Sequence, residues 1–218
     1  MGKVIAIDGP SGAGKGTVAK LLAGKLGFTY LDTGALYRAI ALLFLEKGMR
    51  PEDSDERLSN ALKDAIIAFD NGKIRLNGRD VSADIRSTEA GHFASVFSAR
   101  KVVRDFLLGL QRDMSSDYDL VAEGRDTTTV VFPSAWKKFY VDASVDERIR
   151  RRYLQLKGMS ADVTEADARK DIVERDKRDS GRDIAPLAKA KDAVPMDTTN
   201  MSVDQVVEKM LEFIRANP

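Results

Sequence analysis

The feature that most constrains the fold is a glycine-rich loop near the N-terminus. Residues 9–17 read GPSGAGKGT and lie one residue after a short apolar run at residues 4–7. From residue 17 to 26 the apolar side chains recur at helical spacing. A strand, a glycine-rich turn and a helix in this order form a cradle in which backbone N–H groups and the helix dipole bind a phosphate. The sequence therefore predicts a phosphate-binding loop, or P-loop.

The spacing within this loop narrows the prediction. Gly9, Gly14 and Lys15 match the pattern Gly-x4-Gly-Lys, in which the lysine lies near the β and γ phosphates. Gly16 stands where a serine or threonine normally meets magnesium, and the first hydroxyl follows at Thr17. This variant is typical of nucleoside-monophosphate kinases, and Thr17 is the candidate contact to Mg²⁺ through the ATP phosphates and water. A chance glycine-rich turn is the alternative, which the flanking strand and helix disfavour.

The rest of the chain alternates predicted strands and helices. We predict helices over residues 35–46, 59–69, 88–114, 146–156 and 203–214, and strands over 120–122, 138–141 and 193–196. Asn71-Gly72 and Asn77-Gly78 are strong hairpin signals, so we expect a small antiparallel segment near residues 66–84. The alternation predicts an α/β fold with a parallel sheet.

Charge and composition exclude several classes of protein. The 35 Lys and Arg residues against 34 Asp and Glu give a net charge of +1, which offers no electrostatic reason for a nucleic-acid or membrane-surface partner. The absence of cysteine excludes disulfides and suits a reducing compartment. No apolar stretch has the length of a signal-peptide core or a membrane span. We expect a cytoplasmic protein with no nucleic-acid or membrane partner, acting as a monomer.

Arginines dominate the remaining candidate site residues. Phosphoryl transfer needs positioning and charge neutralisation more than acid–base groups, and the single histidine, His92, is expected to be an ordinary residue. Arg148 and Arg152 share a helical face, which suits a lid that grips phosphates. The alternative is a solvated helix in which Glu147 pairs with Arg151.

A second basic cluster follows near residue 175. Arg175, Asp179 and Arg182 are spaced four and three residues apart, as on one face of a helix. The alternative is surface decoration, because Glu174 with Arg178 and Arg175 with Asp179 are ordinary i,i+4 ion pairs.

Four segments carry a resemblance to a known family. They are IDGPSGAGKGT at residues 7–17, LDTGALYR at 31–38, EGRD at 123–126 with TVVFP at 129–133, and RDKRD at 175–179. Through them the chain, from residue 4 to 214, resembles the bacterial-type cytidylate kinases, which are P-loop nucleoside-monophosphate kinases. The resemblance implies phosphorylation of CMP and dCMP to CDP and dCDP by ATP and Mg²⁺, through in-line transfer of the γ-phosphoryl group, in pyrimidine nucleotide metabolism.

The same resemblance implies the architecture. It is a single kinase domain with a three-layer P-loop kinase fold, a central parallel sheet, a small antiparallel β insertion and a short lid. We expect the core at about residues 1–35, 85–147 and 183–218, the monophosphate-binding region with its β insertion at about 36–84, and the lid at about 148–182.

Site residues are carried over from the family position by position. The resemblance implies catalytic roles for Lys15, Arg148 and Arg152. It assigns ATP binding to Gly9, Pro10, Ser11, Gly12, Ala13, Gly14, Lys15, Gly16 and Thr17. It assigns acceptor binding to Thr33, Arg38, Ser95, Arg104, Arg125, Asp126, Arg175, Asp179 and Arg182.

Individual tasks follow from the chemistry of these side chains. Arg38 and Arg125 suit a bidentate grip on the acceptor phosphate. Ser95, Arg104 and Asp126 suit the polar edge of cytosine, whose exocyclic amine donates to a carboxylate. Asp179 suits the sugar hydroxyls. For Ser95 the alternative is a helix-interior hydroxyl that bonds to the preceding turn.

Two departures from the family pattern stand out. Thr33 replaces a usual serine, and Thr127-Thr128 replaces a common Met-Gly. Both departures are minor, since neither removes a required group, and only the second is expected to shift the shape of the pocket. Two other functions stay open at this point. One is a P-loop kinase for another small molecule, which a substrate panel would reveal, and the other is a non-catalytic nucleotide sensor, which would bind ATP without turnover.

Overall fold

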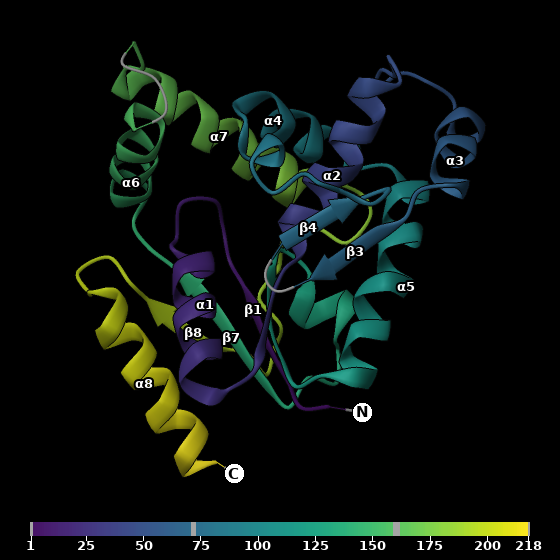
Figure 1. The fold of residues 1–218 in the computed structure, drawn as a ribbon. Helices are drawn as coiled ribbons and strands as arrows, with labels where there is room; N and C mark the ends of the chain where they lie inside the picture. Colours follow the sequence, from purple (N-terminus) through teal and green to yellow (C-terminus); the bar gives the residue numbers. More distant parts are fainter. Residues whose placement is uncertain (1, 71–72, 159–161, 218) are drawn as a thin grey trace. The chain divides into compact units, whose positions relative to one another are not determined.

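The computed structural model describes residues 2–70, 73–158 and 162–217. It consists of two compact units. The first unit comprises Met1–Leu31 and Ser115–Pro218, and the second comprises Asp32–Met114. Each unit is described by itself below, with the elements labelled as in Figure 1.

The central sheet has five strands in the order β2-β6-β1-β7-β8. These strands are β1 (Val4–Asp8), β2 (Thr29–Asp32), β6 (Leu120–Gly124), β7 (Lys137–Asp142) and β8 (Val194–Asp197). β1 pairs in parallel with β6 and β7, and β7 pairs in parallel with β8. The predicted parallel sheet and its four predicted strands are confirmed, whereas β2 was missed because its TYLD sequence is short and only half apolar.

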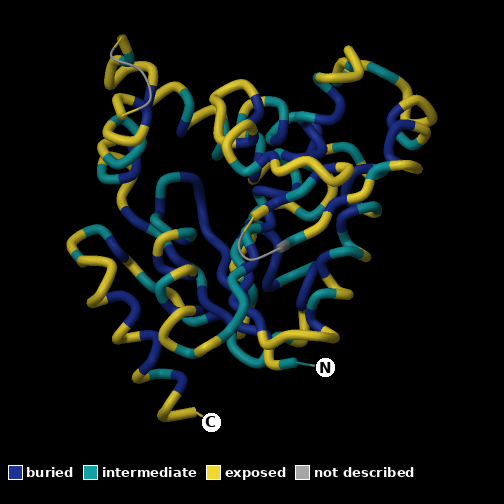
Figure 2. The backbone as a smooth tube through the Cα atoms, in the orientation of Figure 1, coloured by how far each residue is buried: buried dark blue, intermediate teal, exposed yellow. Residues whose placement is uncertain are grey.

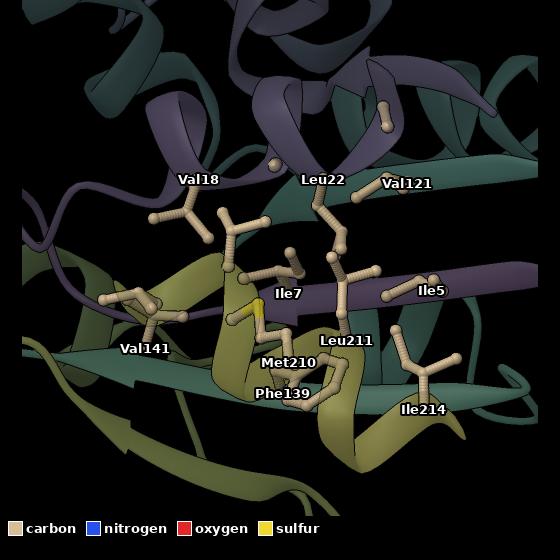
Figure 3. Close-up of a cluster of buried hydrophobic side chains, with 14 of the residues drawn as sticks. Ile5, Ile7, Val18, Leu22, Val121, Phe139, Val141, Met210, Leu211 and Ile214 are labelled. Atoms are coloured by element: carbon tan, nitrogen blue, oxygen red, sulfur yellow. The ribbon is translucent and has the colours of Figure 1, made fainter. Parts of the chain in front are cut away.

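Two helices cover one face of this sheet. All five residues of β1 are buried (Figure 2), and α1 (Lys15–Leu26) and α8 (Val203–Ala216) pack against them. Figure 3 shows Val18 and Leu22 of α1, Met210 and Leu211 of α8 and the strand residue Ile7 gathered in one cluster. Burial of these side chains supplies the main stabilisation of the first unit.

The register of the sheet sets the place of the P-loop. Asp8, the last residue of β1, pairs with Gly124 on one side and Tyr140 on the other. Because the carboxyl ends of parallel strands lie at the same edge of a sheet, the loop that starts at Gly9 begins beside the segment that follows β6. A single π-helical turn, η2 (Thr127–Val131), lies between β6 and β7.

The remaining helices of the first unit are α6 (Val145–Lys157) and α7 (Glu165–Gly181), which pack through Ile149, Leu156, Ala168 and Ile172. The predicted helix at 146–156 is confirmed. Arg182 lies just beyond the end of α7 with φ −73° and ψ 142°. The prediction that it continues the helical face of Arg175 and Asp179 is therefore wrong, because the helix ends at Gly181, a residue that favours helix poorly.

The second unit combines helices with a small sheet. Its elements are α2 (Thr33–Glu46), α3 (Asp55–Lys63), β3 (Ile67–Asp70), β4 (Lys73–Leu76), β5 (Arg79–Asp80), η1 (Asp84–Arg86), α4 (Thr88–Phe97) and the first part of α5 (Lys101–Asp117). The strands form an antiparallel sheet in the order β3-β4-β5.

This small sheet confirms the predicted antiparallel segment near residues 66–84. Asn77 and Gly78 both have positive φ values, 50° and 82°, as a type I′ hairpin turn requires. The other predicted turn, Asn71-Gly72, lies outside the described residues.

Two predicted helices in the second unit have the wrong extent. The helix predicted over 59–69 ends at Lys63, because the β-branched and aromatic run that follows pairs as β3 with β4. The helix predicted over 88–114 is two helices with a break after Phe97. Arg100 holds this break, since its Nη2 donates to the carbonyl of Asp53 at 2.9 Å and to the Asp55 carboxylate at 2.5 Å.

Among the described residues, no helix is both long enough and apolar enough to cross a bilayer.

Candidate active site

The P-loop has a backbone that only glycine fits at key positions. Gly9 has φ 152°, and a Cβ there would lie 1.9 Å from the carbonyl oxygen of Val141. Gly12 has φ 78°, and a Cβ would lie 2.9 Å from the carbonyl oxygen of Arg148. The helix α1 begins after Gly14 with neither a side-chain cap nor an acidic residue in its first turn. Its first N–H groups are therefore available to an anionic ligand.

Lys15 is the most perturbed group of the loop. Only 4% of its surface is exposed, and its Nζ donates to the Pro10 carbonyl at 2.8 Å. Burial, and next the positive charge of Arg125, lower the pKa of Lys15 from 10.5 to about 7, against the opposing effect of Glu123. A phosphate bound beside Lys15 would supply a negative charge that stabilises its charged ammonium form.

Arg148 of α6 holds the carbonyl side of the loop. Its Nη1 donates to the carbonyl of Ser11 at 3.1 Å and to the Asp176 carboxylate of α7 at 2.6 Å, and its Nε donates to the carbonyl of Ala143 at 3.2 Å. The side chain is 6% exposed. One buried guanidinium thus connects the P-loop to both helices of the predicted lid.

Arg151 and Thr198 bind the P-loop at the carbonyl of Ala13, two residues after the Ser11 carbonyl that Arg148 binds. The guanidinium of Arg151 donates to the Ala13 carbonyl at 3.3 Å and to the carbonyl oxygen of Thr198 at 2.7 Å. The Thr198 hydroxyl lies 3.2 Å from the Ala13 carbonyl and 3.0 Å from the Asp142 carbonyl, and accepts from Arg151 at 3.1 Å. These bonds occupy loop carbonyls and leave the loop N–H groups for a ligand. Arg151 also donates to Glu147 at 2.9 Å, so the i,i+4 pair named in the alternative interpretation of this helix is present.

Two predicted acceptor residues, Arg125 and Asp126, lie in the segment directly after β6. Their partners are Asp179 in α7 and Arg182 just after it. Arg125 Nε donates to Asp179 at 2.7 Å, and Arg182 Nη2 lies 3.5 Å from the carboxylate of Asp126. Burial lowers the pKa of Arg125, but the nearby carboxylates of Asp179 and Glu123 outweigh it and raise the pKa above its usual value. Arg125 therefore stays charged.

Arg152 and Arg175 share a single carboxylate. Asp171 accepts from Arg152 at 2.7 Å and from Arg175 at 3.0 Å. Burial, only partly offset by Asp171, lowers the pKa of Arg175. Of the two i,i+4 pairs named in the alternative interpretation, the one between Glu174 and Arg178 is present at 3.7 Å. In place of the other, Asp179 pairs with Arg125 and Arg175 pairs with Asp171.

The four other predicted acceptor residues belong to the second unit. Thr33 is the buried first residue of α2, and Arg38 donates to the N-cap Asp32 at 2.8 Å. Arg104 is buried, lies 5.7 Å from the ring of Tyr37 and donates to the carbonyl of Ser98 at 3.1 Å. Ser95 lies on α4.

Several residues that complete these networks were missed in the sequence. Asp171 offered one signal, its i,i+4 spacing to Arg175. Glu123 and Asp176 lie in two of the segments that carry the family resemblance, but their partners lie far along the chain and they were given no role. Thr198 offered no signal. Glu123 accepts from the hydroxyl of Tyr30 at 3.5 Å, and the two oxygens would lie 3.4 and 3.3 Å from a Cβ added at Gly16.

The side chains present fit a magnesium ion that is held mainly by phosphates and water. Thr17 is exposed in the first turn of α1. In the described part of the chain, no group of three or more His, Asp or Glu residues forms a metal cage. Mg²⁺ commonly uses one or two protein oxygens with substrate phosphates.

A parallel sheet, a P-loop and an arginine-rich segment facing it define a P-loop kinase. A model of the cytidylate kinase family matches residues 5–216, so the chain belongs to that family. Cytidylate kinases of Thermodesulfovibrio yellowstonii and Thermotoga maritima are 49% and 44% identical to this chain; the alignments cover 98% and 99% of it, and 98% of either relative.

Solved structures resemble the fold at low sequence identity. An uncharacterized protein from Eubacterium ventriosum has a TM-score of 0.57 at 14% identity, with 98% of both chains covered. A gluconokinase from Sinorhizobium meliloti has a TM-score of 0.50 at 12% identity, with 99% of this chain and 93% of that chain covered.

Proposed function

We propose that this chain transfers the γ-phosphoryl group of ATP to CMP and dCMP, giving CDP and dCDP for pyrimidine nucleotide metabolism. One observation carries the proposal beside the family membership. Lys15 of the P-loop and Arg125 after β6 lie close enough that Arg125 lowers the pKa of Lys15. Two neighbouring cations are stabilised by anions placed with them, and a triphosphate beside a monophosphate supplies these anions.

The donor side is the P-loop. We assign ATP binding to residues 9–17, with their backbone N–H groups around the β and γ phosphates. Mg²⁺ would be held near Thr17, and when bound it neutralises charge on those phosphates. Lys15 would move from the Pro10 carbonyl to a phosphate oxygen.

The acceptor side draws on nine residues. Arg38 and Arg125 would grip the CMP phosphate, Asp179 the sugar, and Ser95, Arg104 and Asp126 the cytosine edge. We assign the remaining contacts to Thr33, Arg175 and Arg182. Three arginines of this set lie in the first unit: Arg125, Arg175 and Arg182. Carboxylates or carbonyls already orient them, which reduces the entropy lost when a nucleotide binds.

Lid residues would act during transfer. We propose that Arg148 and Arg152 contact the transferred group and that residues 148–182 form the lid, with 36–84 as the monophosphate-binding region and the remaining residues as the core. Asp176 and Asp171 hold these two arginines in the structure. Contact with phosphate would require each guanidinium to share or exchange its carboxylate.

The chemistry is an in-line displacement. A phosphate oxygen of CMP forms a bond to the γ-phosphorus, the bond from that phosphorus to the β–γ bridging oxygen breaks, and ADP leaves. The attacking phosphate is already ionised, so no dedicated base is needed. Closure of the lid would exclude water, which otherwise competes as acceptor.

A substrate panel tests the proposal. ADP release is measured with AMP, CMP, dCMP, UMP and GMP as acceptors, for the native chain and for Lys15→Ala. We expect CMP and dCMP to be the best acceptors and Lys15→Ala to lose most activity. A strong preference for AMP or UMP, or equal rates in the lysine variant, would overturn it.

We further propose that the protein acts as a cytoplasmic monomer without nucleic-acid or membrane partners. Light scattering during size-exclusion chromatography tests the monomer, for which a mass near 24.0 kDa is expected.

A further inference from the structure

A buried carboxylate directly before the P-loop has no part in the chemistry described above. Asp8 is the last residue of β1, and none of its surface is exposed. Its Oδ1 accepts from the N–H of Thr127 at 2.9 Å and from the Thr127 hydroxyl. Its Oδ2 accepts from the N–H of Thr128 at 2.7 Å and from the Thr128 hydroxyl at 2.5 Å. Each carboxylate oxygen thus receives two donors from one threonine.

The three residues stand at a junction in the first unit. Asp8 precedes Gly9 of the P-loop, and Thr127 and Thr128 follow Asp126, which is predicted to contact the acceptor. The carbonyl of Asp126 also accepts from the N–H of Val130 at 2.8 Å, which closes the turn η2 behind it. The carboxylate therefore connects the start of the donor loop to the end of the acceptor segment.

Burying a charge is costly unless hydrogen bonds compensate for it, and here four donors do so. Two are backbone N–H groups, which any residues except proline would supply at these positions. The other two are the hydroxyls of Thr127 and Thr128, which only a hydroxyl-bearing side chain would supply at these positions. Both threonines are 1% exposed, so their hydroxyls are directed to the carboxylate rather than to solvent.

We propose that Asp8, Thr127 and Thr128 form a positioning clasp that fixes Arg125 and Asp126 relative to the P-loop. The proposal rests on the proposed function, since it concerns the alignment of two bound phosphates. The clasp residues act through their neighbours Gly9 and Asp126 and do not touch substrate. In-line transfer depends on the geometry of the reacting atoms, and a displacement of about 1 Å costs about 100-fold in rate. Loosening the clasp should therefore lower kcat more than it weakens the binding of either nucleotide.

The test removes the hydroxyls and keeps the shape. Thr127→Val, Thr128→Val and the double variant are prepared in the full chain, with Thr127→Ser/Thr128→Ser as the variant that restores both hydroxyls. Thr129→Val is the matched control, because the Thr129 hydroxyl lies 3.5 Å from the Asp126 carbonyl and does not bond to Asp8. kcat, the KM values for ATP and CMP, and urea unfolding are measured for each.

We expect kcat of the double valine variant to fall about tenfold, with both KM values within about threefold, and kcat of the serine and Thr129 variants to stay within about twofold of the native chain. If the double variant does not fold, the two single variants decide, each with an expected loss of about threefold. Unchanged kcat with lowered stability would show a merely structural role and overturn the clasp. Failure of the native chain to phosphorylate CMP would instead overturn the proposed function, so the two failures are distinct.

Discussion

At the scale of single residues, Lys15 shows how the fold prepares a site before any ligand binds. The lysine pattern was readable in the sequence, but its depressed pKa was not, because it arises from burial and from Arg125, which is 110 positions away along the chain. With a pKa of about 7, the Lys15 side chain of the free protein is only partly protonated near neutral pH, whereas a lysine with the ordinary pKa of 10.5 is fully protonated there.

This pKa predicts proton uptake when ATP binds. At pH 8 most Lys15 side chains of the free protein are neutral, and a bound triphosphate favours the charged form, so the complex should take up nearly one proton. ATP itself is already fully ionised at that pH. Titration calorimetry in Tris and in HEPES should give different binding enthalpies for the native chain and similar ones for Lys15→Met. Equal enthalpies for the native chain would contradict the pKa.

Gly16 has a steric reason to lack a side chain. A Cβ there would lie 3.3 Å from the Tyr30 hydroxyl and 3.4 Å from the Glu123 carboxylate. Alanine in place of glycine gains about 1 kcal/mol in a helix, and crowding of this kind costs about the same or more. We expect Gly16→Ala to bring no net gain in the native background and to stabilise the Tyr30→Phe variant by about 1 kcal/mol in urea unfolding. An identical effect in both backgrounds would show that the hydroxyl does not crowd this position.

At the scale of elements, local patterns predicted most helices and strands, and the errors had both local causes and causes in partners far along the chain. Residues 66–69 have a β-branched and aromatic sequence, yet a helical spacing of apolar residues hid it until the pairing of β3 with β4 was known. Arg182 follows its neighbours at helical intervals but lies past the helix end. The sequence alone cannot show that Asp179 pairs with Arg125, because the i,i+4 spacing makes Arg175 an equally good candidate partner for Asp179.

The shared carboxylate of Asp171 is a polar connection between α6 and α7 that the sequence did not reveal. Asp171→Asn weakens its bonds to Arg152 and Arg175 and leaves two poorly paired, mostly buried guanidinium groups. We expect the unfolding free energy to fall by about 1–3 kcal/mol. Glu174→Gln on the same helix is the control, because Glu174 is 47% exposed and pairs with Arg178 at 3.7 Å. A loss as large in the control would assign the effect to helix charge rather than to the shared carboxylate.

The turn between β8 and α8 also contributes to the P-loop. Thr198 is 2% exposed, and its hydroxyl serves the Ala13 carbonyl, the Asp142 carbonyl and Arg151. Thr198→Val should lower stability by about 1–3 kcal/mol, because buried partners lose a hydrogen bond. The KM for ATP should rise severalfold as the loop loosens, while Thr198→Ser keeps both values near those of the native chain. A normal KM for ATP in the valine variant would limit Thr198 to a role in stability.

At the scale of the whole molecule, the proposed donor and acceptor sites differ in the units that they involve. The residues assigned to ATP all belong to the first unit. The residues assigned to CMP belong to both, with Thr33, Arg38, Ser95 and Arg104 in the second. This assignment of acceptor residues to both units came from the family resemblance, because no regular spacing in the sequence relates Arg38 to Arg125.

Hydrogen exchange followed by mass spectrometry tests that division directly. Ligand binding slows exchange where it stabilises the native backbone, and ligand at 100 times its Kd adds about 2.7 kcal/mol of stability. A non-hydrolysable ATP analogue alone should slow exchange in the P-loop and the start of α1, with little effect on the start of α2. CMP alone should slow exchange both near Arg125 and over the first turns of α2, where Thr33 and Arg38 lie. Arg38→Ala should remove the protection of α2 by CMP and leave the effect of the ATP analogue unchanged. Protection by CMP confined to one unit would contradict the assignment of acceptor residues to both.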